Sequence, residues 1–440
     1  MISAQSLAAN PATASRSIMQ FSDFKFGICI IYFLSMLVPS EMFFEVAGVR
    51  FEIYRFILIF SFFVFAREMI EYAQREKVVK YLLAYVAICA LALFYNHGLA
   101  SLESIFIHFL EVYVGFFIGM SVAADPQRFK ILLKVVCIGY ILLIPFAIVE
   151  SQNGYRILHV WAADISGNYF AGIKGSLEYL GDSYYRYGLH RASTVFSHPI
   201  LYSVVAACTI PLVFLTFGRS WWLWSIGLFV ALVTSVTSAG ILMVIMFFGM
   251  RFLKSVSKFY PSVYKHILYV VVAWFFVVLI FSNRGPIPVL IDLMAINPET
   301  GYARYLQWEY ASDDVRDNLL FGIGFKEWSR PWWMSASVDN YWLMVALRFG
   351  CVALVTIAAV YITNMVRVWK LYMVSGALSH YMFFTCLLQL AFAGVTVHFF
   401  DRAALYVFMM LGVLSSFIIA HRIQLLDWSR DMALSQAEKG

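Results

Sequence analysis

The sequence is poor in charge. Aspartate, glutamate, lysine and arginine make up 13% of its 440 residues, whereas 62% of the residues are hydrophobic and the mean hydropathy is +0.77. Soluble domains carry roughly 25% charged residues, and roughly half of their residues are apolar. The shortage of charge therefore excludes a soluble globular domain. The composition instead predicts a membrane protein that crosses the bilayer several times. We expect it to be all-α, because a helix makes all of its backbone hydrogen bonds within itself and needs no water in lipid.

The sequence also lacks the motifs that bind metals and nucleotides. Its six cysteines all lie inside apolar runs, without a Cys-x-x-Cys pair or a zinc-finger spacing. They are predicted to be small buried hydrophobic residues rather than a disulfide framework or a metal site. There is no P-loop, no Rossmann glycine run and no His-Glu-x-x-His sequence. We therefore expect no cofactor, no metal site and no nucleic-acid partner.

Long apolar runs fill most of the chain. About twelve of them have the length of about 17–25 residues that crosses the hydrocarbon layer of a bilayer. Lysine and arginine gather in alternate short connections, such as residues 67–80 and 251–265, whereas the opposite connection 96–103 has none. The positive-inside rule then predicts that both termini lie in the cytoplasm. The runs are centred near residues 35, 59, 87, 113, 140, 206, 228, 247, 275, 350, 388 and 411.

Two connections are far longer than the rest, at about residues 150–195 and 284–338, and both are predicted to lie outside. The sequence shows no internal repeat of the kind that forms the paired halves of secondary transporters. No low-complexity linker divides it either. We therefore expect one integral membrane domain over residues 1–440, carrying two long outer loops. Within the second loop, the first part of residues 301–333 is predicted to form an amphipathic helix, and Gly322 and Gly324 are predicted to form a turn after it.

The two outer loops are rich in arginine and aromatic residues. Residues 183–203 read SYYRYGLHRASTVFSHPILYS and place Arg186 and Arg191 among tyrosines and histidines. The planar guanidinium fork suits phosphate because it binds two oxygens at once. Aromatic residues and arginine also gather at lipid headgroups without any ligand. The number of cations on the outer face, where positive charge is usually sparse, favours an anionic ligand there.

The stretch 337–350 reads SVDNYWLMVALRFG and combines an apolar run with an Asp-Asn pair at its start and an arginine inside it. Asp339 suits either capping of a helix N-terminus or the acceptance of a proton from a ligand. Arg348 lies about 12 Å along a helix from Asn340, at a depth where an unpaired cation in lipid is costly. Glu111 is an acid at a similar predicted depth. We expect either a direct Glu111–Arg348 ion pair or a separate polar partner for each side chain.

Four stretches, taken in order, resemble the O-antigen ligase/polymerase superfamily. The stretch 191-RASTVFSHPILYS-203 is similar to the family's Arg-x-x-Gly/Ser-Thr-Phe-x-x-Pro sequence, and 233-VTSVTSAGILMVIM-246 is similar to its small-residue break between helices. The stretches 304-RYLQWEYA-311 and 319-LLFGIGF-325 are similar to its Arg…Trp…Gly-x-Gly loop. Asp339, Asn340 and Gly350 are similar to its His-Asn-x9-Gly segment, with Asp339 at the histidine position. The resemblance covers about residues 180–415.

The resemblance implies a GT-C-like fold and a glycosyltransferase that needs neither metal nor nucleotide. Members of the family transfer a glycan from an undecaprenyl diphosphate carrier to a hydroxyl on the outer face of the bacterial plasma membrane. The ligases use a lipid acceptor, and the polymerases join repeat units and work with a separate chain-length regulator. Asp339 in place of the ligase histidine favours a polymerase of a surface polysaccharide or exopolysaccharide.

Two alternatives stay open beside the polymerase. The first is a ligase-type transferase that acts on a lipid or protein acceptor. The second is a flippase or exporter of lipid-linked glycans, for which charged residues should follow a central path through the membrane. The ionisable residues of this sequence gather in the outer loops instead.

The resemblance also implies roles for individual residues. Arg191 and Arg304 would hold the diphosphate, with Arg284 as a third cation. Asp339 would be the base, and Asn340 would bind a sugar hydroxyl or cap the helix. His198 and His398 are alternative bases. The remaining predicted substrate-binding residues are Arg186, Arg348 and Glu111.

Overall fold

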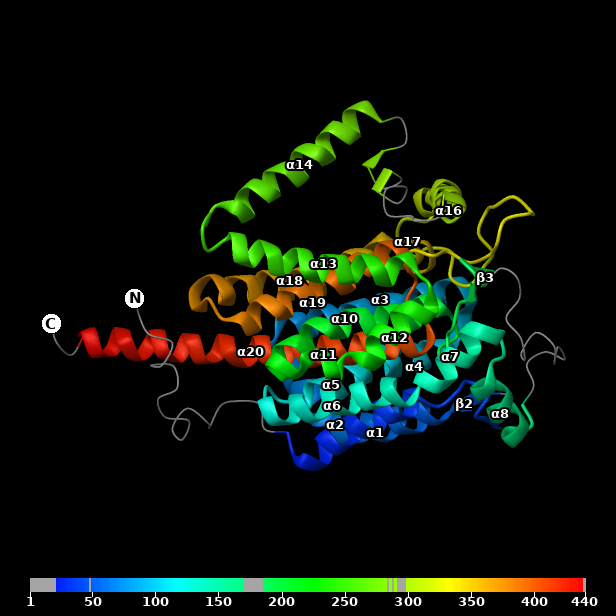
Figure 1. The fold of residues 1–440 in the computed structure, drawn as a ribbon, viewed down its shortest axis with the longest axis horizontal. Helices are drawn as coiled ribbons and strands as arrows, with labels where there is room; N and C mark the ends of the chain where they lie inside the picture. The colour runs from blue at the N-terminus through cyan, green and yellow to red at the C-terminus, as the bar shows by residue number, and fades with distance from the viewer. Residues whose placement is uncertain are drawn as a thin grey trace.

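The computed structural model describes residues 21–46, 49–168, 185–282, 285–286, 289–290 and 298–437. Within these ranges the chain is a helical bundle, and the paired strands form two short antiparallel hairpins, β1–β2 and β3–β4. The prediction of an all-α membrane protein is confirmed at this level (Figure 1). The elements of the first half are α1 (Asp23–Met36), β1 (Phe43–Val46), β2 (Val49–Glu52), α2 (Ile53–Arg75), α3 (Lys77–His97), α4 (Leu102–Phe109), a π-helical turn (Leu110–Val114), α5 (Gly115–Met120), α6 (Pro126–Leu142), α7 (Ile144–Asn153) and α8 (Ile157–Ser166).

The second half begins with the small hairpin and ends with the longest helix. The elements are β3 (Tyr185–Arg186), β4 (Leu189–His190), α10 (Pro199–Phe217), α11 (Trp221–Trp224), α12 (Ile226–Ser235), α13 (Ser238–Val256), α14 (Val263–Phe281), α16 (Pro298–Asp317), α17 (Tyr341–Phe349), α18 (Cys351–Ser375), α19 (Leu378–Thr396) and α20 (Asp401–Ala437). Short 3-10 turns at Gly98–Ser101 and Gly218–Ser220 connect α3 to α4 and α10 to α11.

Eight continuous helical segments in the described part of the chain are long and apolar enough to cross a membrane. One of them, Lys77–Met120, holds both α3 and α4–α5, which meet at Gly98, where φ is +58°. The short helices α1 and α12 are not among the eight. The finer count of about twelve crossings therefore stays a prediction.

The core of the bundle forms around α20 and α10. In the apolar part of α20, 94% of the residues are buried, and in that of α10 and α11 78% are, whereas α14 has no fully buried residue and projects from the body (Figure 1). The backbones of α20 and α5 touch, because a Cβ on Gly119 or Gly412 would lie 1.9 Å from a carbonyl oxygen of the other helix. Such close approach between membrane helices requires small residues.

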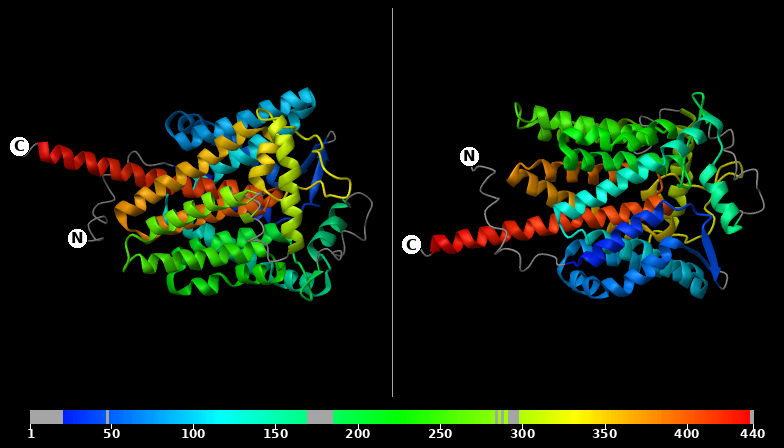
Figure 2. Two further views of the ribbon diagram at one scale, coloured as in Figure 1. Left: turned by 90° about the horizontal axis from the view of Figure 1, so that it is seen from above. Right: turned by 60° about the horizontal axis from the view of Figure 1, so that its bottom comes forward.

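The described chain starts and ends at the same end of the bundle. Arg128 at the start of α6 pairs with Asp23 at 2.8 Å, and Arg422 of α20 lies 3.6 Å from Glu76, between α2 and α3. The far end of α20 extends beyond the bundle on this side (Figures 1 and 2). Helix α8, the two hairpins and α16 lie at the opposite end (Figure 1). We call the first the α20 end and the second the α16 end.

The second long loop contains a helix at the predicted place. Helix α16 covers the part of residues 301–333 expected to be helical, and it lies across the α16 end of the bundle (Figure 2). The predicted turn at Gly322 and Gly324 is confirmed, with φ angles of +56° and +62°. A Cβ on Gly322 would lie 2.5 Å from the carbonyl oxygen of Leu347, so this loop packs directly on the end of α17.

Candidate functional site

A small polar cavity at the α16 end brings together residues from four distant parts of the sequence. It has a volume of about 160 Å³. Five of the predicted site residues line it, although they come from β3, from the loop before α10, from α16 and from the segment before α17. The lining residues are Arg186, Arg191, His198, Ile200, Thr237, Ser238, Arg304 and Asp339.

A buried carboxylate positions the loop that carries Arg191 into the cavity. Glu150, near the end of α7, is 2% exposed and accepts hydrogen bonds from Ser193 N at 3.2 Å, Ser193 Oγ at 3.0 Å and Thr194 N at 2.8 Å. Thr194 has a φ of +54°, a strained value for a β-branched residue. The Glu150 carboxylate thus supplies the interactions that hold this strained turn in place.

Backbone contacts from α12 fix the other side of the same loop. Ala192 N donates to Thr234 O at 2.9 Å, and Arg191 Nε donates to Ser235 O at 3.3 Å. Helix α12 ends at Ser235, and Thr237 caps α13, which accounts for the break expected between these helices. Arg191 is therefore buried, at 4% exposure, in a fixed frame of backbone groups.

Helix α16 contributes a buried cation to the polar cavity. Arg304 is 7% exposed, and its Nε has no hydrogen-bond partner among the described residues. One turn further along α16, Gln307 Oε1 accepts a hydrogen bond from Asp339 N at 2.8 Å. This bond ties the segment before α17 to α16 and places Arg304 and Asp339 in one cavity wall.

Asn340, rather than Asp339, caps α17. Asn340 Oδ1 accepts a hydrogen bond from Leu343 N at 2.9 Å, with the extended backbone of an N-cap residue. The prediction that Asp339 caps this helix is therefore wrong, and the capping role expected for Asn340 is confirmed. Because its neighbour provides the cap, the Asp339 carboxylate lines the cavity instead.

The cavity shifts the pKa values of Asp339 and His198 in opposite directions. Burial raises the pKa of the Asp339 carboxyl, although Arg304 and Arg191 oppose the rise. Burial and the surrounding arginines lower the pKa of His198 to about 4, so its ring is neutral near pH 7. His198 Nδ1 accepts a hydrogen bond from Ile200 N at 3.2 Å, which leaves the proton on Nε2. In this tautomer the only ring lone pair of His198 is used by Ile200 N, and Nε2 carries a proton that it can donate.

The direct ion pair considered for Glu111 and Arg348 is wrong. Glu111, in the π-helical turn, accepts from Tyr54 Oη at 3.1 Å and lies 3.6 Å from Arg55 Nε. Arg348 Nη1 donates to the carbonyl oxygens of Gly324 at 2.8 Å and Lys326 at 3.0 Å. Glu111 and Arg348 therefore each have a separate polar partner, which is the second of the two alternatives expected from the sequence.

Glu111 and Arg348 nevertheless share a second cavity. It has a volume of about 340 Å³, is lined mainly by aromatic and apolar side chains, and also contains His398. Tyr341, the first residue of α17, lines this cavity, whereas Asp339 lines the polar one. His398 is thus separated from Asp339 by the start of α17. Arg284 lies outside the described residues.

Two residues that build the site were not predicted from the sequence. Glu150 could have been found, because it is a single carboxylate at the end of the apolar run FAIVESQN. Gln307 carried no signal beyond its place in a helix. Both act on backbone groups, Glu150 on Ser193 and Thr194 and Gln307 on Asp339.

No protein-family model matches this chain, and no curated protein matches it in sequence. The assignment of a function therefore depends on the chemistry of the cavity and on the resemblance of the four motif stretches.

Proposed function

We propose that this protein is a polysaccharide repeat-unit polymerase, a GT-C-type glycosyltransferase that uses an undecaprenyl diphosphate-linked oligosaccharide. The observation that supports the proposal best is the buried guanidinium of Arg304. It faces a cavity with Arg186, Arg191 and Asp339, and its Nε has no partner among the described residues. A buried guanidinium N–H without a hydrogen-bond acceptor is costly. A bound anion removes that cost.

The charge of the cavity suits a diphosphate diester. Three arginines and one aspartate line it, and with a neutral His198 the sum is +3 − 1 = +2. A diphosphate diester carries about two negative charges at neutral pH. A cavity of about 160 Å³ has room for a phosphate group but not for a whole oligosaccharide, so the glycan and the lipid chain would extend beyond it.

The reaction requires displacement of the lipid diphosphate by a sugar hydroxyl. The hydroxyl oxygen forms a bond to the anomeric carbon, the bond from that carbon to the diphosphate oxygen breaks, and the lipid diphosphate leaves. The arginines stabilise the charge that grows on the leaving phosphate. Asp339 accepts the hydroxyl proton, and its raised pKa makes it a stronger base than an ordinary carboxylate. His198 Nε2–H donates to a phosphate or sugar oxygen.

The wider arrangement is part of the same proposal. The protein lies in the bacterial inner membrane with about twelve crossings, both termini in the cytoplasm and the α16 end on the outer face. On that face the polar cavity meets lipid-linked glycans, and a separate chain-length regulator is the expected protein partner. The start of α1 and the end of α20 at one end of the bundle support an even number of crossings.

The lipid-linked glycan profile of cells lacking this gene tests the proposal. We expect single repeat units to accumulate on undecaprenyl diphosphate. Accumulation of full-length polymer on its carrier would instead identify a ligase. Accumulation of repeat units on the cytoplasmic face alone would identify a flippase. A profile identical to that of the parent strain would overturn all three.

A further inference from the structure

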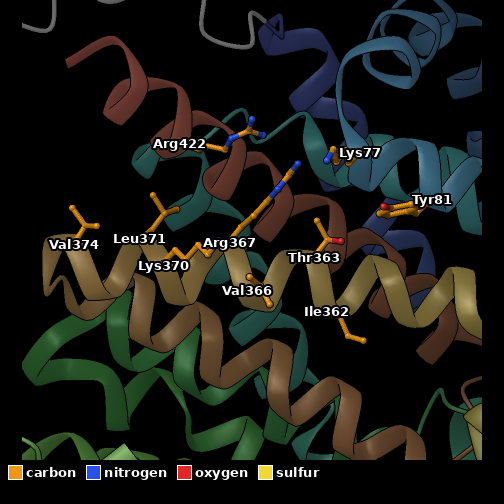
Figure 3. A pocket seen from close by; sticks show the side chains of 10 residues that line it. All are labelled: Lys77, Tyr81, Ile362, Thr363, Val366, Arg367, Lys370, Leu371, Val374 and Arg422. Atoms are coloured by element: carbon orange, nitrogen blue, oxygen red, sulfur yellow. The ribbon is translucent and has the colours of Figure 1, made fainter. Parts of the chain in front are cut away.

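A larger cavity lies at the opposite end of the bundle, beside α20. It has a volume of about 590 Å³ and opens between α3, α18 and α20 (Figure 3). Four cations line it, and none of its lining residues is acidic. We call it the α20-end cavity. Its lining residues are Lys77, Tyr81, Ile362, Thr363, Val366, Arg367, Lys370, Leu371, Val374 and Arg422.

The cations of this cavity exceed the acids around it. Glu76 Oε2 pairs with Arg367 at 3.1 Å and lies 3.6 Å from Arg422. Among the side chains that the structure describes, Lys77 and Lys370 have no ion pair with a carboxylate. With Glu76 included, the sum of charges is +4 − 1 = +3. In Figure 3, Arg367 extends from α18 toward Arg422 and Lys77. The positive charges thus surround a common space.

The apolar part of the lining faces the membrane. Ile362, Val366 and Val374 lie on one stripe of α18, a helix that has the length and hydropathy to span a bilayer, and they are 60%, 47% and 71% exposed. In a bilayer such side chains meet acyl chains. The cavity therefore joins a lipid-facing apolar stripe to a cluster of cations at the membrane boundary.

We propose that the α20-end cavity binds an anionic phospholipid of the adjacent leaflet, with the phosphate among Lys77, Lys370, Arg367 and Arg422 and an acyl chain along Ile362 and Val366. Basic pockets between membrane helices suit anionic lipid headgroups because the phosphate replaces missing counterions while the chain stays in hydrocarbon. A soluble anion would use the cations but not the apolar stripe. The inference depends on the membrane location of the protein and not on glycan transfer.

Native mass spectrometry of the purified full-length protein tests the proposal. The protein is mixed in detergent with phosphatidylglycerol or phosphatidylcholine, and the lipid that it retains is counted. We expect retention of phosphatidylglycerol in preference to phosphatidylcholine. The double variant Lys77→Gln/Lys370→Gln should weaken phosphatidylglycerol binding by about five-fold for each lysine removed.

A matched control keeps the charge change but leaves the cavity intact. Lys80→Gln/Lys258→Gln removes two exposed lysines from the same end of the bundle, neither of which lines the cavity. It should retain phosphatidylglycerol as the parent does. If the first double variant does not fold, Val366→Trp provides a second test, because it fills the cavity, keeps all four cations and should also reduce retention.

Three outcomes would overturn the proposal. One is equal retention of the two lipids by the parent protein. Another is equal loss of phosphatidylglycerol from both double variants, which would mean that net charge alone attracts the lipid. The last is full displacement of the lipid by an equal concentration of glycerol phosphate, which would make the cavity a site for free phosphate groups. None of these outcomes bears on the glycan profile that tests the polymerase.

Discussion

Two cationic cavities lie at opposite ends of this bundle, and they differ in what surrounds their arginines. In the polar cavity at the α16 end, Arg191 and Arg304 are both buried, Arg191 donates to the backbone of Ser235, and helix caps at Thr237 and Asn340 fix the neighbouring segments. In the α20-end cavity, Arg367 and Arg422 share Glu76, and exposed apolar residues of α18 complete the lining. The first cavity has about 160 Å³ and the second about 590 Å³.

The two proposed sites are therefore distinguished by what surrounds their cations, and not by cavity size or by the number of cations. The smaller cavity has features that suit the proposed catalysis, namely buried cations and a carboxylate with a raised pKa, on a segment that a hydrogen bond to Gln307 fixes. The larger one has the features of a lipid contact, namely open access and an apolar wall. Substitutions in each cavity test this difference between a reaction site and a lipid contact.

The largest effect is expected from Arg304→Ala. It removes the buried guanidinium that we assign to the leaving diphosphate, and loss of one such donor lowers turnover by roughly 100- to 1,000-fold. Polymer should therefore be absent from cells, while lipid-linked single repeat units accumulate. The measurement is the glycan profile, combined with the amount of protein in the membrane.

The matched control for this change is Arg316→Ala. Arg316 lies on the same helix, but it is 73% exposed and pairs with the exposed Asp313. Normal polymer in the Arg304→Ala strain would remove Arg304 from the site. Loss of polymer in the Arg316→Ala strain would show that any damage to α16 is sufficient, and the comparison between the cavities would then lose its support.

Asp339→Asn should reduce transfer by about 100-fold or more, the usual contribution of a general base. The Asp339 carboxylate accepts a proton only when it is ionised, and burial raises its pKa above the usual value of about 4. The parent enzyme should therefore lose activity as the pH falls through this raised pKa, and it should keep activity above it. In the Asn variant this acidic limb of the profile should disappear. The check is a pH profile of turnover with a lipid-linked repeat unit.

Asp313→Asn serves as the control, because Asp313 is an exposed acid on α16 and lines neither cavity. An unchanged acidic limb in the Asp339→Asn protein would assign the titration to another group. His198 is not expected to take this role, because its Nδ1 accepts the hydrogen bond of Ile200 N.

A smaller effect is expected from Glu150→Gln, which acts on the frame rather than on the substrate. One of the two carboxylate oxygens becomes an amide that opposes an N–H donor of Ser193 or Thr194. The loss of one such bond should lower stability by about 2 kcal/mol. We expect turnover to fall by about 10-fold as Arg191 loses its fixed position. Thermal unfolding and kinetics measure the two effects, and the exposed Glu103 provides the control Glu103→Gln.

If Glu150→Gln unfolds at the same temperature as the parent, the carboxylate does not hold the turn. If it is less stable but keeps full activity, the turn does not position Arg191. Either result would contradict the view that the polar cavity is a preorganised site. The two cavities would then no longer differ in how firmly their arginines are held.

Composition and helical pattern were sufficient to predict several features. The shortage of charge indicated a membrane protein, the residues of α16 indicated a helix across the outer loop, and two glycines marked the turn after it. These features follow from residue type and order along the chain. The resemblance of the motif stretches implied in addition that Arg191, Arg304 and Asp339 act together, and they line one cavity.

Other features depend on contacts that residue order does not determine. Asp339 and Asn340 are both good N-cap residues, and only the backbone geometry decides that Asn340 caps α17. Glu111 and Arg348 line the same cavity but meet different partners, because Tyr54 and Arg55 lie beside Glu111 and the backbone of segment 324–326 lies beside Arg348. Glu150 acts on a turn 43 residues away, a distance that no local pattern reveals.

The smallest effect on function is expected from Glu76→Gln, which affects only the α20-end cavity. It removes the shared partner of Arg367 and Arg422 and raises the local charge by one. Retention of phosphatidylglycerol should rise by about five-fold, since a lipid phosphate replaces the lost carboxylate. Transfer of glycan should be unchanged, because the polar cavity lies at the other end of the bundle. The control Glu71→Gln removes an acid of the same helical region that pairs with Arg67 outside the cavity. If Glu76→Gln abolished transfer while Glu71→Gln did not, the two ends would be coupled, and the division between a reaction site and a lipid site would no longer describe the molecule.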